Sequence, residues 1–294
     1  MLSSLDQLTH WRAGLPDHEA VGVLVGSFDI LHPGNLQALE AAEGAAMHVL
    51  VLLRPDETQC HSAEQRAAFL LGVRGVDHVA QLSVEEVATL LDGQNFHIST
   101  IAEGDADAFA DAVTARTLAV GSLPQPACPS AEAVVDAIRS GATPIESPEP
   151  GPRGNHAATG RRVSVNGCFD ILHLGHVDML SRAKAMGDHL TVLINSDASV
   201  QRYKGATRPV MPQSFRARAL RALRSVDAVE VFDEDNPLSL LETLKPDVHV
   251  KGGSFEESRV ADERALLQSW GGRVEMCPLL ENFSTSRIIE IAAG

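Results

Sequence analysis

A five-residue sequence occurs twice in the chain, at an offset of 141 residues. Residues 28–32 and 169–173 both read FDILH, and the same offset continues without a gap as far as Asp56. At Val76 and Val226 the offset is 150, so the second copy contains nine extra residues in between. Solenoid repeats are only about 20–50 residues long, so a repeat of this length indicates duplicated domains.

Residues 143–160 separate the two copies. Their sequence, TPIESPEPGPRGNHAATG, is rich in proline and glycine and has no apolar periodicity, which is typical of a linker. The total length of 294 residues also suits two domains of ordinary size. We therefore predict a first domain at residues 1–142 and a second at residues 161–294.

Apolar segments of two kinds alternate in the second copy. Helical spacing occurs at 176–186 and 215–226, and short apolar or β-branched runs predict strands at 161–168, 189–196, 228–232, 247–253 and 273–279. This alternation favours a parallel sheet with helices on both faces. The predicted fold class is α/β, with two tandem Rossmann-like, doubly wound parallel-sheet domains that bind ligands at the carboxyl ends of their strands.

The two halves of the chain differ in charge. Residues 1–160 contain 7 arginines, no lysine and 21 acidic residues, whereas residues 161–294 contain 17 basic and 18 acidic residues. Neither half offers the basic field that a nonspecific nucleic-acid binder needs, so we expect no nucleic-acid partner. A small polyanionic ligand is expected in the second half, where cations are available.

The sequence also argues against membrane insertion and secretion. No apolar run approaches the roughly 18 residues that span a bilayer, and the first twenty residues resemble no secretory signal. The four cysteines, Cys60, Cys128, Cys168 and Cys277, form no CxxC pair, which disfavours a disulfide framework or a zinc site. We expect a cytoplasmic protein with no membrane partner and no protein-bound metal.

A histidine pair marks the start of a predicted helix. Residues 166–176 read NGCFDILHLGH, so His173 and His176 are three residues apart and both can face one ligand. Gly175 allows the turn to tighten, and a helix N-terminus binds phosphate through its free N–H groups. Two imidazoles there can stabilise charge that develops on a phosphate. A lone histidine at such a turn can instead be a capping or core residue.

The sequence GCFDILHLGH resembles the HxGH signature of the nucleotidyltransferase superfamily, which contains cytidylyltransferases and adenylyltransferases. The segments NSDASVQRYKGATRPV (195–210), LKPDVHVKGGSF (244–255) and FSTSRII (283–289) follow in the order found in the nucleotidyltransferase domain of ADP-heptose synthases. The resemblance covers nearly all of residues 163–294. Glycerol-3-phosphate and ethanolamine-phosphate cytidylyltransferases are similar more loosely, and the latter have two such domains in tandem.

This resemblance implies transfer of AMP from ATP to a sugar 1-phosphate, with D-glycero-β-D-manno-heptose 1-phosphate favoured and pyrophosphate released. Magnesium would arrive with the triphosphate. One alternative is a CTP-dependent cytidylyltransferase that acts on a polyol or amino-alcohol phosphate, such as glycerol 3-phosphate or ethanolamine phosphate. A second alternative is a noncatalytic, nucleotide-binding scaffold.

Three cations lie close together after the histidine motif, in a segment that we predict to be a polar loop. Lysine and arginine side chains at Arg202, Lys204 and Arg208, with Gly205 between them, suit a mobile clamp on phosphates, although they could also be a solvated basic loop. The resemblance implies that Lys204 contacts the reacting phosphates. We therefore predict His173, His176 and Lys204 as the catalytic residues.

Further binding residues are predicted from the same motifs. The predicted nucleotide-binding residues are Gly167, Cys168, Phe169, Asp170, Gly175, Arg208, Lys251, Gly252, Ser284, Thr285, Ser286 and Arg287. The predicted acceptor-binding residues are Asn195, Asp197 and Arg216. Structural roles stay open for four of them: a small packing residue at Cys168, a turn acceptor at Asp170, a surface arginine at Arg216 and a helix cap at Ser284.

The first copy lacks the residues that would bind phosphate. Asn35 replaces the second histidine, the nine missing residues include the cation-rich segment, and acidic Glu103 and Glu132 fall near the positions of Lys251 and Arg287. We therefore predict a degenerate, inactive domain. We expect it to pack against the second domain as an intramolecular pseudo-dimer, and a further homodimer is possible.

Overall fold

The computed structural model describes residues 1–54, 61–92, 96–98, 160–253, 257–278, 280 and 283–293. The chain divides into two compact units, Met1–Val134 and Val135–Gly294. The predicted domain boundary at residue 142 and the predicted linker up to residue 159 lie outside the described residues. Each unit is described by itself below.

The second unit contains a five-stranded parallel sheet in the order β7-β6-β5-β8-β9. The strands are β5 (Arg162–Gly167), β6 (His189–Asn195), β7 (Ala228–Phe232), β8 (Val248–Gly252) and β9 (Arg273–Cys277). The helices are α7 (Leu174–Lys184), α8 (Asp197–Lys204), α9 (Gln213–Arg221), α10 (Leu238–Leu244), α11 (Glu257–Gln268) and α12 (Thr285–Ala293). All five predicted strands and both predicted helices are present, with ends within a few residues of the predicted ones.

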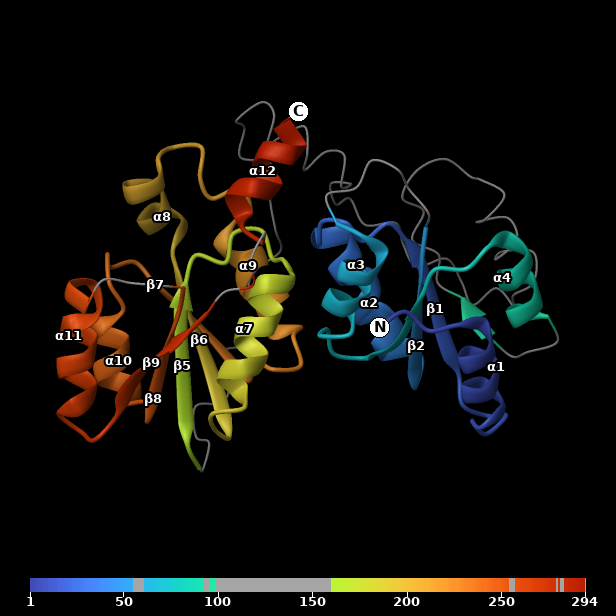
Figure 1. Cartoon of the computed structure of the whole chain (residues 1–294), viewed down its shortest axis with the longest axis horizontal. Helices are drawn as coiled ribbons and strands as arrows, with labels where there is room; N and C mark the ends of the chain where they lie inside the picture. The colour runs from blue at the N-terminus through green and yellow to red at the C-terminus, as the bar shows by residue number, and fades with distance from the viewer. Residues whose placement is uncertain are drawn as a thin grey trace. The chain divides into compact units, whose positions relative to one another are not determined.

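Helices cover both faces of this sheet. Figure 1 shows α7 and α9 on one side of the strands and α10 and α11 on the other. The interior of β5 and β6 is buried on both faces, which explains their continuous apolar sequence. The predicted parallel α/β architecture is therefore confirmed. The chain leaves β5 toward β6 on one side and later returns to β8 on the other, so a ligand-binding crevice is expected at the carboxyl end of β5.

The first unit contains a four-stranded parallel sheet in the order β3-β2-β1-β4. Its strands are β1 (Val21–Gly26), β2 (His48–Leu53), β3 (Val76–Ala80) and β4 (Phe96–Ile98). Its helices are α1 (Leu5–Ala13), α2 (Pro33–Ala45), α3 (Ala63–Leu70) and α4 (Val84–Leu91). The first pairs of the central strands, Val21 with His48 and Arg162 with His189, differ by the same 141 residues as the sequence repeat.

The turn after the first strand has the same backbone in both units. Phe28 has φ 51° and Phe169 has φ 49°, although this left-handed region is uncommon for residues other than glycine. The next residue, Asp29 or Asp170, accepts a hydrogen bond from the backbone N–H of His61 at 2.9 Å or of Met211 at 2.8 Å. The repeat therefore extends to the anchoring of the loop.

The helices are short in both units. None of those in the described part of the chain is long and apolar enough to cross a bilayer.

Candidate functional site

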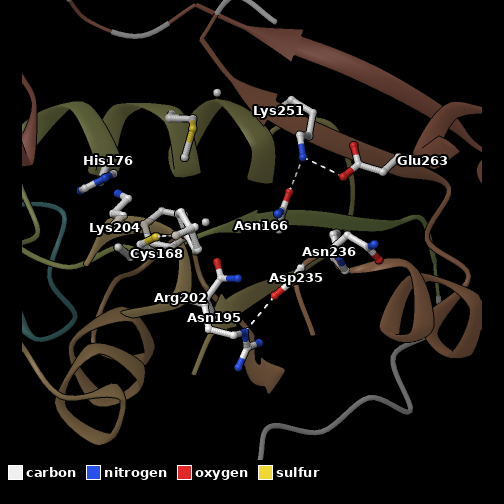
Figure 2. Close-up of a pocket in the computed structure, with 16 residues that line it drawn as sticks. Asn166, Cys168, His176, Asn195, Arg202, Lys204, Asp235, Asn236, Lys251 and Glu263 are labelled. Atoms are coloured by element: carbon white, nitrogen blue, oxygen red, sulfur yellow. Dashed lines mark hydrogen bonds and ion pairs between the residues drawn. The ribbon is translucent and has the colours of Figure 1, made fainter. Parts of the chain in front are cut away.

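A cavity of about 770 Å³ opens at the carboxyl ends of β5, β6 and β8 (Figure 2). It lies where the strand order predicts a crevice. Its described lining consists of Asn166, Gly167, Cys168, Phe169, His176, Met179, Asn195, Arg202, Tyr203, Lys204, Asp235, Asn236, Pro237, Lys251, Gly252 and Glu263. The cavity thus brings together predicted residues from three separate segments of the sequence.

The two histidines meet at the start of α7. His173 is the N-cap residue, but its side chain does not cap the helix, and its ring stacks on that of His176 with centroids 3.8 Å apart. His176 lines the cavity, whereas His173 is buried behind it. The Nδ1 atom of His176 is buried and has no hydrogen-bond partner among the described residues.

Burial lowers the pKa of His176 well below its usual value, and electrostatic interactions with His173 and Lys204 lower that pKa further. The imidazole is therefore neutral at pH 7. In this form it carries one N–H donor that can face an anionic ligand.

Two glycines allow close packing around this turn. A Cβ atom on Gly175 would lie 3.0 Å from the Cβ of Phe283 and 3.1 Å from Nδ1 of His173. A Cβ atom on Gly167 would lie 3.1 Å from the ring of Phe169. A side chain at either position would therefore require its neighbours to shift by a few tenths of an ångström, and Phe283 joins the segment before α12 to the histidine turn.

The start of α12 lies beside the same turn. The side chain of Ser284 accepts a hydrogen bond from the backbone N–H of Arg287 at 3.2 Å. Ser284 therefore caps the helix, which is the structural role left open for it in the sequence analysis. Thr285 Oγ1 donates to the carbonyl oxygen of Ile171 at 3.5 Å. Ser284, Ser286 and Arg287 are exposed and do not line the cavity, so phosphate binding by this motif stays a prediction.

The predicted cation-rich loop is partly helical, which corrects the expectation from sequence. Arg202 and Lys204 lie in the last turn of α8, and Gly205 ends that helix with φ 92°. Lys204 is exposed and lines the cavity near His176 (Figure 2). Arg202 instead donates to Asp235 at 3.0 Å.

Arg208 does not line the cavity. Its Nε donates to the carboxylate of Asp170 at 2.7 Å, and the same carboxylate accepts the backbone N–H groups of Val210 and Met211. Asp170 is only 2% exposed. It therefore fills the structural role left open for it, by fixing the segment that follows α8.

Arg216 is buried, which excludes the surface role considered for it. Its guanidinium donates to the carbonyl oxygens of Met211 at 2.9 Å, Cys168 at 2.6 Å and Asn195 at 2.9 Å. It also donates to the carboxylate of Asp197 at 2.7 Å. Because four protein acceptors already surround it and it does not line the cavity, contact between Arg216 or Asp197 and an acceptor has no geometric support.

Asn195 and Cys168 do line the cavity. Asn195 Nδ2 donates to Ser199 Oγ at 3.1 Å, and the Cys168 thiol contacts the hydroxyl of Tyr203. Burial and this thiol contact raise the pKa of Tyr203, which therefore stays a neutral phenol. Tyr203 and Cys168 together connect α8 to the turn that carries Phe169.

A polar cluster lies at the other end of the cavity, and of its members only Lys251 was predicted from the sequence as a site residue. Lys251 Nζ donates to Oε1 of Glu263 at 2.9 Å and to Oδ1 of Asn166 at 2.8 Å. His249 Nε2 lies 3.2 Å from the same Asn166 oxygen, and His249 Nδ1 lies 2.7 Å from Ser164 Oγ. No local motif marks this cluster, because it forms only where β8 pairs with β5 and α11 packs nearby.

The cluster fixes the protonation of His249. Burial, and then the charge of Lys251, lower the pKa of His249 to about 3, so the ring is neutral. An amide oxygen can only accept, so Nε2 of His249 carries the proton and donates to Asn166. Its Nδ1 then accepts the hydroxyl proton of Ser164.

Within the described residues, no group of three or more His, Cys, Asp or Glu side chains is placed to hold a metal ion.

Comparison with known proteins agrees with this geometry. Residues 164–291 match the model of the cytidylyltransferase-like family. The bifunctional protein HldE of Koribacter versatilis (strain Ellin345) is 50% identical over 130 residues, which are 44% of this chain and 26% of the relative. The bifunctional protein HldE of Streptomyces coelicolor is 50% identical over 137 residues, which are 47% of this chain and 29% of the relative.

A solved lipopolysaccharide core biosynthesis protein from Thermoplasma volcanium GSS1 is 28% identical, covering 42% of this chain and all of that chain, with a TM-score of 0.36. The chain spans about a quarter of the length of the curated relatives it matches. The resemblance stated from sequence is confirmed for the second unit, where residues 164–291 match the cytidylyltransferase-like model and the HldE relatives are about 50% identical.

Proposed function

We propose that the second unit is a nucleotidyltransferase that transfers a nucleotidyl group from a nucleoside triphosphate to a phosphorylated acceptor. The observation that carries the proposal is the position of His176. Its unpartnered ring nitrogen is buried at the first turn of α7, beside a cavity of about 770 Å³ and near the exposed Lys204. The family match over residues 164–291 supports this reading.

The reaction is an in-line displacement. An oxygen of the acceptor phosphate attacks the α-phosphorus, the bond from that phosphorus to the bridging oxygen breaks, and pyrophosphate leaves with the electron pair. No covalent enzyme intermediate is required, so the protein contributes positioning and charge stabilisation. Magnesium, bound to the triphosphate, would neutralise part of its charge.

The residues around the cavity have distinct roles in this proposal. His176 donates a hydrogen bond to the α-phosphate, and His173 holds the ring of His176 by stacking. Lys204 approaches the phosphates from the end of α8. The N-terminus of α12, with Ser284, Thr285, Ser286 and Arg287, would bind the leaving pyrophosphate.

We propose ATP as the donor and heptose 1-phosphate as the acceptor. This choice rests on the resemblance to the nucleotidyltransferase domain of ADP-heptose synthases, and the relatives named HldE support it. CTP with a polyol phosphate stays the alternative, since the matching family is described as cytidylyltransferase-like. The proposed location of the reaction is the cytoplasm.

We also propose that the first unit is a degenerate copy of the second. The shared strand order, the matching strand register and the left-handed Phe28 and Phe169 support duplication. The described register ends at Ile98, which occupies the position of His249. Glu103 and Glu132 themselves lie outside the described residues. One nucleotide site per chain follows, and pairing of the copies as a pseudo-dimer stays a prediction.

The test is a pyrophosphate-release assay on the full chain. ATP, CTP, GTP and UTP are each combined with heptose 1-phosphate, glycerol 3-phosphate or ethanolamine phosphate in the presence of Mg²⁺. We expect release only with ATP and heptose 1-phosphate, and mass spectrometry should show the matching nucleotide-sugar. Nucleotide binding without release on any acceptor would contradict catalysis and favour the scaffold.

A further inference from the structure

The cavity has two ends of different chemistry. His176 and Lys204 lie at one end, and Lys251, Glu263 and Asn166 lie at the other (Figure 2). At the first end an exposed cation stands beside two histidines. At the second end the charges cancel, because Lys251 is paired with Glu263 at 2.9 Å. A phosphate would gain little there, since the carboxylate would repel it.

The second end presents one hydrogen-bond acceptor that is not used. Glu263 is 6% exposed and its Oε1 is bound to Lys251, but its Oε2 is buried without a partner among the described residues. A buried carboxylate oxygen of this kind is costly to leave unpaired. Glu263 also lines the cavity, so a ligand that donates a hydrogen bond to Oε2 would remove that cost.

The same end presents a donor. Both contacts of Asn166 in the cluster, from Lys251 and from His249, use its Oδ1 atom. Its amide nitrogen therefore points the other way, toward the cavity that Asn166 lines (Figure 2). The neutral His249, held by Ser164, keeps the amide in this orientation.

The ligand group must both donate and accept hydrogen bonds and carry no charge. Sugar hydroxyls meet this requirement, and so does the edge of a base. A base also needs a flat apolar surface, and the two phenyl rings of the described lining both lie at the histidine end. The ring centroids of Phe169 and His176 are 5.0 Å apart. Tyr203 contacts Cys168 and precedes Lys204 in the sequence.

We propose that Glu263, Lys251 and Asn166 form a subsite that recognises sugar hydroxyl groups, with His249 as a positioning residue. This inference rests on the proposed function and extends it to specificity. The hydroxyls can belong to the ribose of the nucleotide or to the acceptor sugar. Either source supplies the same donor and acceptor pair.

The first experiment uses the wild-type full chain and needs no variant. KM is measured in the pyrophosphate-release assay for ATP, 2′-deoxy-ATP and 3′-deoxy-ATP, and for sugar 1-phosphates that lack one hydroxyl. For one of the two substrates, we expect removal of one hydroxyl to raise KM about tenfold or more, as is typical for the loss of a hydrogen bond to a charged group. A change below twofold for every deoxy substrate would overturn the subsite. Failure of wild-type turnover with any triphosphate would instead count against the proposed function.

The second experiment assigns that loss to Glu263. Glu263→Gln should raise KM about tenfold for the intact substrate and leave KM for the matching deoxy substrate unchanged. Because this variant leaves Lys251 without its counterion, the double variant Lys251→Met with Glu263→Gln, which contains neither charge, is measured beside it. Lys184→Met removes the 2.6 Å ion pair with Asp227 outside the cavity and serves as the matched control. Equal losses for intact and deoxy substrates in both Glu263 variants would contradict the assignment.

Discussion

After its first strand, each unit turns into a helix through a left-handed phenylalanine, but the side chains at the two turns are used differently. In the first unit His32 Nδ1 accepts the N–H groups of Gly34 and Asn35, at 3.2 and 3.4 Å. Asn35 Oδ1 accepts the N–H of His32 in return. In the second unit His173 does not cap its helix, and His176 faces the cavity.

This difference shows that two turns with the same backbone conformation can use their side chains in different ways. A reciprocal cap satisfies the helix terminus from within and leaves those groups unavailable to a phosphate. In the second unit the side chain of His173 makes no such bond, in keeping with the phosphate binding proposed above. What the two units share therefore serves folding, and what differs is where binding is expected.

The shared buried arginine gives the largest expected effect. Arg66 donates to the carbonyl of Ser27 at 2.5 Å, and Arg216 donates to the equivalent carbonyl of Cys168 at 2.6 Å. Arg216→Met should lower the free energy of unfolding of its unit by about 3 kcal/mol or more, because several buried carbonyls lose their donor. Chemical denaturation measures this loss. Arg66→Met is the parallel variant, and a loss under about 1 kcal/mol in both would show that the anchor is dispensable.

Conversion of the second turn into the first tests the difference directly. His176→Asn combined with Leu174→Pro gives the sequence HPGN, which the first unit already folds. We expect kcat to fall about 100-fold or more, as for the loss of one preorganised donor, with little change in thermal stability. The single variant His176→Ala should lower kcat to a similar degree. A folded double variant with near wild-type turnover would refute the catalytic role of His176.

Acid sensitivity should be greater in the second sheet, although burial also lowers the pKa of His78 in β3 of the first. The pKa of His249 is about 3 in the folded protein and near 6.5 in an unfolded chain, so between these values the unfolded chain binds a proton that the folded one does not. The stability of the second unit should therefore fall as the pH drops below about 6.5, by up to 1.4 kcal/mol per pH unit. The equivalent residue by strand register is Ile98, which does not titrate.

The variant His249→Gln isolates this contribution. Its urea midpoint should change less between pH 7 and pH 5 than that of the wild type. An unchanged pH dependence in the variant would show that His249 is not the group responsible.

Lys204 lies in the segment that the first unit lacks. Lys204→Ala should lower kcat about tenfold and change KM for the nucleotide less, because an exposed lysine engages fully only when charge develops on the phosphates. Steady-state kinetics with varied ATP separates the two parameters. Lys184→Met, which removes a cation outside the cavity, is the control. A rise in KM alone would exclude a transition-state role for Lys204.

The sequence was most informative where one segment determines the structure. The apolar runs predicted a parallel sheet and its strand positions in the second unit. The repeated FDILH and the glycine of HxGH predicted the histidine turn. It was less informative for α8, whose polar residues resemble a loop and whose helix is secured by the cap at Ser196. Arg208 and Arg216 could not be placed, because a charged side chain is buried only when distant carbonyls and carboxylates surround it. Glu263 and His249 depend on tertiary pairing alone.

The smallest expected effect belongs to the first turn. His32→Ala removes a cap that accepts two backbone N–H groups, so the first unit should lose about 1 kcal/mol of stability. Turnover should stay unchanged, because in the degenerate copy this imidazole is committed to its own helix and no lysine exists among residues 1–160. Calorimetric titration with a nonhydrolysable ATP analogue should give one site per chain before and after the substitution. A stoichiometry near two in the wild type, reduced to one by His32→Ala, would show that the closed turn opens for nucleotide and that both copies bind.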